Sequence, residues 1–261
     1  MSRWFQVKRF LQYRLHSRTR YGIHSPFIFD LVEKVFRDRK IYPQYEMIES
    51  LRKNLWMNHA EIDVEDFGAG SQAIKTTGRE ISAIARTSAK PKKYAQLLFR
   101  LVKYFEAKEI LELGTSLGIS TSYLAMANPE AKVFTLEGSK SIAEVAENNF
   151  RELGIKNIQL LRGEFQTSLP QALARISSVD FLFLDGNHRL APTLFYFNQC
   201  LTKANENSVF VIDDIHWSQE MEQAWKQIQQ HPRMTMTIDL FSFGLVFFRE
   251  GLGRRNEIVR F

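Results

Sequence analysis

The pattern of apolar and polar positions predicts alternating strands and helices over the second part of the chain. Strands are predicted near residues 109–113, 132–136, 157–161, 180–185 and 207–213, with a helical pattern in each interval. This alternation is typical of an α/β fold with a parallel sheet. Two further β-rich runs, 234–240 and 243–249, are separated by a Phe-Ser turn and predict an antiparallel hairpin.

The first part of the chain predicts helices without this alternation. A helix is expected from Pro26 to about Arg37, because Ser25 suits the N-cap and proline suits the first helical position. Further helices are expected over residues 44–58 and 92–105. We therefore expect an N-terminal helical extension, residues 1–92, followed by a cofactor-binding domain, residues 93–261.

A lid-like loop is expected within this extension, at residues 61–79. Its glycine motif, Asp66 to Ser71, has the spacing of a cofactor-binding turn but is not preceded by a buried strand or followed by a helical stripe. The segment is interpreted as an exposed hairpin or lid loop, which either closes over a bound ligand or is an ordinary surface loop.

The stretch 109–127 is the centre of the predicted domain. An apolar run ends in a turn with Gly114 and Gly118, and a helix begins directly after it. Glycines allow a ligand to approach the backbone, and the first helical turn offers free N–H donors to a carboxylate or phosphate. Side chains that add donors there are those of Thr115, Ser116, Ser120 and Thr121. This pattern indicates a nucleotide-cofactor site.

This turn is compatible with two kinds of cofactor site. A dinucleotide fingerprint is disfavoured, because G-x-G-x-x-G is absent. The stretch instead resembles the first motif of class I S-adenosylmethionine-dependent methyltransferases, in which an acidic residue, here Glu112, precedes the glycine turn and helps to hold the methionine end of the cofactor. The resemblance continues at Glu137-Gly138-Ser139, where that family has a carboxylate for the two ribose hydroxyls.

The resemblance covers about residues 97–249 and implies a fold and further contacts. It implies a Rossmann-like, doubly wound sheet of seven strands in the order 3-2-1-4-5-7-6, with strand 7 antiparallel. It also implies that the segment after strand three holds the adenine, which assigns Gly163, Glu164 and Phe165 to the cofactor.

Acidic residues after strands four and five resemble a narrower group, the catechol and caffeoyl-CoA O-methyltransferases. That group has one Asp after strand four and an Asp-Asn pair after strand five, which bind a divalent metal. Asp185, Asp213 and Asp214 occupy these positions, with Asp214 in place of Asn, and oxygen ligands favour Mg²⁺ or a similar cation. Asp185 is also assigned to the cofactor and to catalysis.

His188 stands where the catechol enzyme has a lysine base, so it is the candidate catalytic base. The alternative for the aspartates is helix capping without a metal. The alternative for His188 is a loop histidine bonded to a neighbouring carboxylate. His216 and Trp217 are expected to line the pocket.

Charge and composition add a second feature at the N-terminus. The formal net charge is +6, and six basic residues precede the first acidic one, Asp30. Apolar residues at near-helical spacing within this basic arm, residues 1–20, leave two interpretations open: binding to an anionic membrane or nucleic acid, or packing on the chain itself or on a second subunit. We favour packing of the stripe formed by Trp4, Phe10, Leu11 and Leu15.

Together these features predict an S-adenosylmethionine-dependent methyltransferase that acts on a small-molecule acceptor at oxygen. The single Cys200 is expected in a packed helix, and no apolar run is long enough to span a bilayer. We expect a cytoplasmic protein without a nucleic-acid partner, whose N-terminal helices are available for a homodimer. The alternatives are an NAD-type oxidoreductase, or a non-catalytic cofactor-binding protein that docks through its basic arm.

Overall fold

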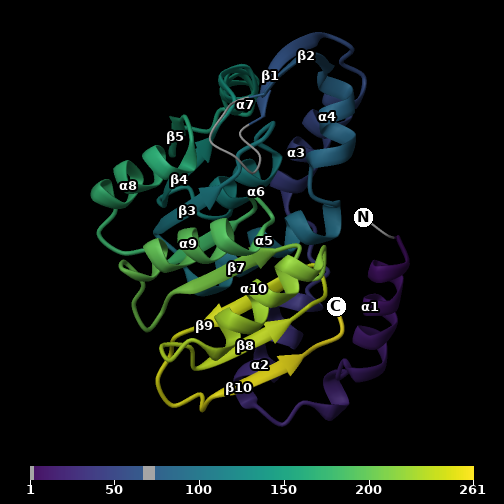
Figure 1. The fold of residues 1–261 in the computed structure, drawn as a ribbon, viewed down its shortest axis with the longest axis vertical. Coiled ribbons are helices and arrows are strands. Elements are labelled where there is room, and N and C mark those ends of the chain that lie inside the picture. Colours follow the sequence, from purple (N-terminus) through teal and green to yellow (C-terminus); the bar gives the residue numbers. More distant parts are fainter. Residues whose placement is uncertain (1–2, 67–73) are drawn as a thin grey trace. The chain divides into compact units, whose positions relative to one another are not determined.

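The computed structural model describes residues 3–66 and 74–261 and has an α/β fold (Figure 1). Its contacts divide the chain into two compact units. The first consists of Met1–Asp38 and Ser178–Phe261, and the second of Arg39–Ser177. No helix in the described ranges is long and apolar enough to cross a membrane. The predicted boundary between residues 92 and 93 stays a prediction.

The second unit contains a parallel three-stranded arrangement in the order β3-β4-β5. Each strand is followed by a helix, and the strand ends are aligned, with Leu113 beside Leu136 and Glu137 beside Arg162. The elements are α3 (Pro43–Trp56), β1 (Glu61–Asp66), β2 (Ile74–Glu80), α4 (Ile81–Ser88), α5 (Lys92–Phe105), β3 (Glu109–Leu113), α6 (Ile119–Ala127), β4 (Lys132–Glu137), α7 (Lys140–Glu152), β5 (Ile158–Arg162) and α8 (Phe165–Arg175).

The first unit contains strands in the order β6-β7-β9-β8-β10, in which β9 is antiparallel to both neighbours (Figure 1). Its elements are α1 (Arg3–His16), η1 (Arg20–Gly22), α2 (Pro26–Leu31), η2 (Val32–Phe36), β6 (Phe181–Leu184), α9 (Leu190–Leu201), β7 (Val209–Asp213), α10 (Gln219–Gln230), β8 (Met236–Asp239), β9 (Phe243–Phe247) and β10 (Arg255–Ile258).

The predicted strands lie within about two residues of the observed ones. Within each unit the neighbours are those of the predicted order, and the order across both units stays a prediction. Among the described residues, β10, α4 and the short helix η1 were not predicted. Strand β10, Arg-Asn-Glu-Ile, is polar and largely exposed, so no apolar run marks it. The helix expected from Pro26 to Arg37 continues past Leu31 as the wider π turn η2, and α4 was not expected.

Strands β6 and β7 are buried along their whole length, and β3 and β4 over most of theirs, which places the core at the sheet. Strands covered on both faces read as continuous Val, Ile, Leu and Phe runs, because neither face needs polar residues. Their carboxyl ends carry the acidic residues described below. Cys200 is buried in α9, as expected, and burial raises the pKa of its thiol.

The residues Ser141-Ile142-Ala143-Glu144 have the form of a capping box, which predicts a helix that opens at Ser141 and is ended by Gly154. Helix α7 begins two residues earlier, with Ser139 at the N-cap position, and Ser141 lies within the helix and donates to the backbone carbonyl of Asp63. The predicted end is confirmed. Gly154 has a φ of +67°, and the N–H groups of Gly154 and Ile155 donate to the carbonyls of Arg151 and Phe150, which is a Schellman motif.

The segment expected to form a hairpin or lid loop is a hairpin. β1 and β2 pair antiparallel, with an irregularity between Ile62 and Val64. The lid role stays a prediction, and residues 67–71 of the glycine motif lie outside the described residues.

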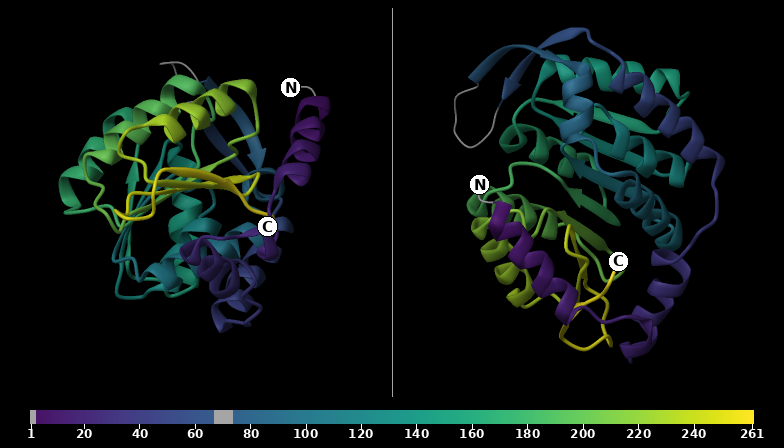
Figure 2. Two further views of the ribbon diagram at one scale, coloured as in Figure 1. Left: turned by 90° about the horizontal axis from the view of Figure 1, so that it is seen from below. Right: turned by 90° about the vertical axis from the view of Figure 1, so that its right-hand side faces the viewer.

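The basic arm forms α1, but most of the predicted stripe does not pack on the body of the chain; of its four residues, Phe10 contacts the ring of Phe241. Tyr13 is the buried residue of the helix, while Trp4, Phe10, Leu11 and Leu15 are exposed. In Figure 2, α1 lies beside the C-terminal strands of its own unit. The opposite face is used because Arg9 and Tyr13 have polar partners on the body, at Glu222 and Val259, which the apolar spacing did not reveal.

We expect Gly118→Ala to destabilise the protein more than Gly154→Ala. Both glycines have positive φ, which costs roughly 1 kcal/mol for alanine. A β-carbon at Gly154 meets nothing within 4 Å, whereas one at Gly118 would come within 2.5 Å of the Phe150 ring. Overpacking adds about 1–3 kcal/mol. Urea unfolding of both variants measures the difference, and equal midpoints would contradict the packing argument.

Candidate functional site

The glycine turn between β3 and α6 is held to the end of β4. The N–H groups of Gly114 and Thr115 both donate to the carbonyl of Leu136, at 3.0 and 3.1 Å. Gly114, Ser116 and Gly118 have φ values of 106°, 47° and 83°, which accounts for the glycines at two of these positions. Gly118 is the N-cap of α6 and has no side chain, so no side-chain cap occupies the donors of the first turn.

Glu112 is fully buried beneath this turn. Its Oε2 accepts hydrogen bonds from Thr121 of α6 at 2.5 Å and Thr135 of β4 at 2.7 Å. Its Oε1 is buried and has no partner among the described residues. Burial raises the pKa of this carboxyl to about 7, although the hydroxyl donors oppose the rise. A buried acceptor of this kind suits a positively charged donor from a ligand.

Glu137 is fixed at the end of β4 by backbone donors. Its Oε2 accepts the N–H of Ser116 at 2.8 Å, and its Oε1 accepts the N–H of Ser139 at 3.0 Å. Burial raises the pKa of Glu137, and the two N–H groups partly offset that effect. Each carboxylate oxygen has a second lone pair, so the group can also accept two ligand hydroxyls.

The structure brings the other predicted cofactor residues to the same ends of β3, β4 and β5. Gly138 and Ser139 follow β4, and Gly163, with a φ of 115°, follows β5 and donates to the carbonyl of Glu137 at 2.9 Å. Glu164 is the N-cap of α8, and Phe165 begins that helix half-buried.

Not all of the predicted donor side chains are available. Thr115 is buried and bonded to Thr135 at 2.6 Å, and Thr121 is used by Glu112. The Ser120 hydroxyl also favours the ionised form of Glu112, which lowers the pKa of that carboxyl. The backbone N–H groups of the first turn of α6, which were predicted as donors, are therefore better placed to bind a ligand than the hydroxyl groups of that turn.

The ends of β6 and β7, in the other unit, gather acidic groups around a histidine. Ligand atoms of Asp185, His188 and Asp213 lie within 4.8 Å of one another. His188 Nε2 is 3.5 Å from Asp185 Oδ1, and His188 Nδ1 is buried without a partner among the described residues. Two carboxylates and an imidazole form a donor set for a divalent cation.

Asp214, the third predicted ligand, is not in this group of three. It is a partly exposed residue with a φ of 53°, and its Oδ2 lies 4.0 Å from His188 Nε2. Two of the three predicted ligands, Asp185 and Asp213, thus come together, and the third member of the group is His188, which was predicted as the catalytic base. The role of Asp214 as a ligand stays a prediction.

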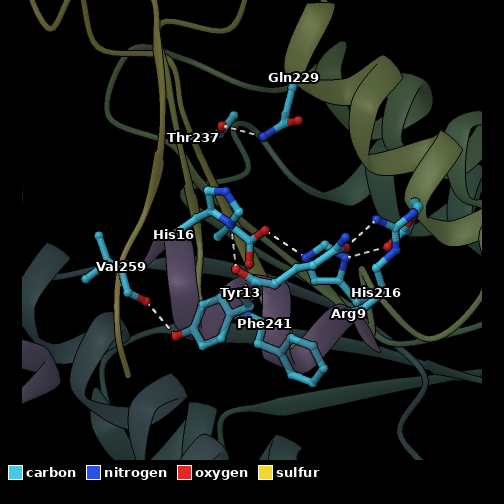
Figure 3. A network of polar contacts seen from close by, with 11 residues as sticks. Arg9, Tyr13, His16, His216, Gln229, Thr237, Phe241 and Val259 are labelled. Carbon is cyan, nitrogen blue, oxygen red and sulfur yellow. Dashed lines mark hydrogen bonds and ion pairs between the residues drawn. The ribbon is translucent and has the colours of Figure 1, made fainter. Parts of the chain in front are cut away.

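The His216 side chain is fixed by two carboxylates of the same unit (Figure 3). Its Nδ1 contacts Glu222 Oε1 at 3.0 Å, and its Nε2 contacts Asp239 Oδ2 at 2.7 Å. Burial opposes protonation, but the two carboxylates outweigh it and raise the pKa of His216. Its ring stacks on Phe241. This arrangement assigns a structural role to His216, while Trp217 is exposed and its pocket role stays a prediction.

Sequence reasoning missed two sets of polar residues. Thr135, which bonds both Glu112 and Thr115, could have been found as the one hydroxyl in the otherwise apolar centre of β4. The second set joins α3 to α6: Tyr123 donates to Glu49 at 2.8 Å, and the buried Arg52 donates to the same oxygen at 3.1 Å. Its members are far apart in the sequence, so no local pattern connects them.

Comparison with known proteins finds methyltransferases in both sequence and structure. Residues 111–215 match a family described as a methyltransferase domain. A catechol O-methyltransferase of Niastella koreensis is 32% identical over 126 residues, which cover 47% of this chain and 55% of that protein. A catechol O-methyltransferase of Mycobacterium tuberculosis is 30% identical over 122 residues, covering 46% and 54%. The chain thus matches about half the length of these relatives.

Among solved structures, an O-methyltransferase of Bacillus cereus in complex with S-adenosylhomocysteine has a TM-score of 0.59 and 18% identity. The similarity covers 84% of this chain and 95% of that one. At this level of identity the similarity is one of fold, and it covers more of the chain than the sequence matches do. Residues 111–215 therefore match the methyltransferase domain family, and the chain shares its fold with an O-methyltransferase of known structure.

Proposed function

We propose that this protein is an S-adenosylmethionine-dependent methyltransferase that acts on a small molecule at oxygen. The observation that carries the proposal is the pair of fixed carboxylates, Glu112 beneath the glycine turn and Glu137, which accepts the N–H of Ser116 in that turn. The names of the relatives support the reaction and the type of acceptor, since both are catechol O-methyltransferases.

The residues of the turn fit the parts of this cofactor. Glu112 Oε1, buried and unpartnered among the described residues, would accept from the ammonium group of the methionine moiety. The N–H groups at the start of α6 would donate to its carboxylate. Glu137 would accept both ribose hydroxyls, while Glu164 and Phe165 would contact the adenine. When bound, the cofactor supplies a methyl group already activated by its sulfonium.

We further propose that Asp185, His188 and Asp213 hold a divalent cation. The support is the mixed donor set and the unpartnered Nδ1 of His188. A bound cation would polarise an acceptor oxygen and offset the repulsion between the two carboxylates. Asp214 carries a charge where the related enzymes have Asn and lies close enough to His188 to orient it.

A second role for His188 is supported by its contact with Asp185. Without a cation, the imidazole is free to take the proton of an acceptor hydroxyl, and Asp185 at 3.5 Å stabilises the resulting positive charge. Few further catalytic groups are needed, because positioning the nucleophile supplies much of the rate acceleration of a methyl transfer.

Calorimetric titration with S-adenosylhomocysteine tests the cofactor assignment. The wild type should show saturable binding, and Glu137→Ala should lose at least about tenfold in affinity, because two charge-assisted hydrogen bonds disappear. Glu130→Ala, an exposed acid of the same unit, is the matched control and should bind like the wild type. Saturable binding of NADH in place of S-adenosylhomocysteine would establish the oxidoreductase alternative and overturn the proposal.

The cation is tested by Mn²⁺ titration and by turnover after EDTA treatment. We expect saturable Mn²⁺ binding that is lost in Asp213→Asn, while this variant still binds S-adenosylhomocysteine. EDTA should abolish turnover, and Mg²⁺ or Mn²⁺ should restore it. Turnover that survives EDTA, falls at acidic pH and disappears in His188→Ala would instead assign His188 as the base.

Glu112→Gln should change the free energy of unfolding and the affinity for S-adenosylhomocysteine in opposite directions. The pKa of Glu112 rises from 4.5 to about 7 on folding, so the folded state binds this proton more tightly. Its contribution to stability is therefore lost as pH rises from about 4.5 to about 7, and the total loss is roughly 3 kcal/mol.

The glutamine variant lacks this ionisation. Relative to the wild type, its free energy of unfolding should improve between about pH 5 and about pH 8, while its affinity for S-adenosylhomocysteine falls at least about tenfold. Urea unfolding without ligand and calorimetry measure the two effects. Parallel pH curves for the two proteins would contradict the assigned ionisation.

A further inference from the structure

Helix α1 is held to its own unit by one face. Arg9 forms an ion pair of 2.6 Å with the buried Glu222, which also contacts His216, and the Tyr13 hydroxyl donates to the carbonyl of Val259 at 2.7 Å (Figure 3). Phe10 and Tyr13 contact the ring of Phe241 at 5.1 and 5.4 Å between centroids. These contacts fix which side of the helix faces outward.

The outward side carries an apolar stripe. Trp4, Val7, Leu11 and Leu15 are 80%, 49%, 57% and 82% exposed, and they recur every three or four residues, so they lie along one face. Tyr13, on the opposite side, is 5% exposed. A contiguous row of large apolar side chains in water is costly unless a partner covers it.

Basic residues flank this stripe. Lys8 and Arg14 are exposed next to Leu11 and Leu15, and α1 contains no acidic residue. An apolar face with Trp and Leu between cations is the pattern of a helix that lies in the plane of a membrane interface. The cations match the phosphates of anionic lipids, and the stripe matches the boundary with the acyl chains.

We propose that α1 docks the protein on an anionic lipid surface through Trp4, Val7, Leu11 and Leu15, with Lys8 and Arg14 at the phosphates. A second copy of α1 fits this face less well, because self-association would bring cations together without an acid on either helix. A nucleic acid fits less well too, since its phosphates offer no apolar partner to the centre of the stripe.

Co-sedimentation with vesicles tests this docking on the full chain. The wild type should bind vesicles of mixed phosphatidylcholine and phosphatidylglycerol. Its binding should be weaker to vesicles of pure phosphatidylcholine, and weaker to the mixed vesicles at raised salt. Leu11→Glu with Leu15→Glu should reduce the binding at least about tenfold. Lys8→Gln with Arg14→Gln should reduce it about fivefold per charge.

A matched control replaces exposed apolar residues elsewhere. Ile41→Glu with Met47→Glu introduces the same charge change outside α1 and should bind vesicles like the wild type. All variants should retain binding of S-adenosylhomocysteine, which shows that they fold and keeps this test separate from the proposed activity.

Three results would overturn the proposal. The first is equal vesicle binding by the wild type and the Leu11→Glu, Leu15→Glu variant. The second is a dimer in sedimentation equilibrium that this variant dissociates, which would assign the stripe to a second copy. The third is salt-sensitive binding of an RNA oligonucleotide that the same variant abolishes, without binding to vesicles.

Discussion

The buried carboxylate of Glu112 is the constraint on which the second unit depends. It receives one hydroxyl from α6 and one from β4, so a single side chain on β3 ties together the strand, the helix and the neighbouring strand. A carboxyl buried in this way is costly to ionise, which is why its pKa rises to about 7. Costs of this kind are concentrated at functional sites, and the second oxygen of Glu112 has no partner among the described residues.

Glu137 is also fixed by hydrogen bonds from neighbouring segments. Its two oxygens accept N–H groups from the turns after β3 and β4, so the carboxylate is aimed before any ligand arrives. Less conformational entropy is lost on ligand binding when the acceptor groups are already fixed than when they are mobile. In the other unit, Asp185 and Asp213 lie beside His188 at the ends of β6 and β7, and the negative charge of the two carboxylates favours a cation there.

Much of this could be predicted from the sequence, because the signals are local. The apolar runs located the strands, the glycine spacing located the turn, and the acidic strand ends located Glu112, Glu137, Asp185 and Asp213. The rest depends on contacts between distant segments. Ser139 is the N-cap position of α7 where the capping-box pattern favours Ser141, and the Ser141 hydroxyl donates instead to the carbonyl of Asp63, far back along the chain. The outward face of α1 depends on Glu222 and Val259, which lie far along the chain from Arg9 and Tyr13.

A crystal structure with S-adenosylhomocysteine is the most direct measurement of how the turn is used. We expect both ribose hydroxyls within hydrogen-bonding distance of Glu137, and the ammonium group within that distance of the Glu112 oxygen that is unpartnered here. A ligand bound away from the ends of β3 and β4, or one that leaves both carboxylates without contact, would contradict the assignment of this turn to the cofactor.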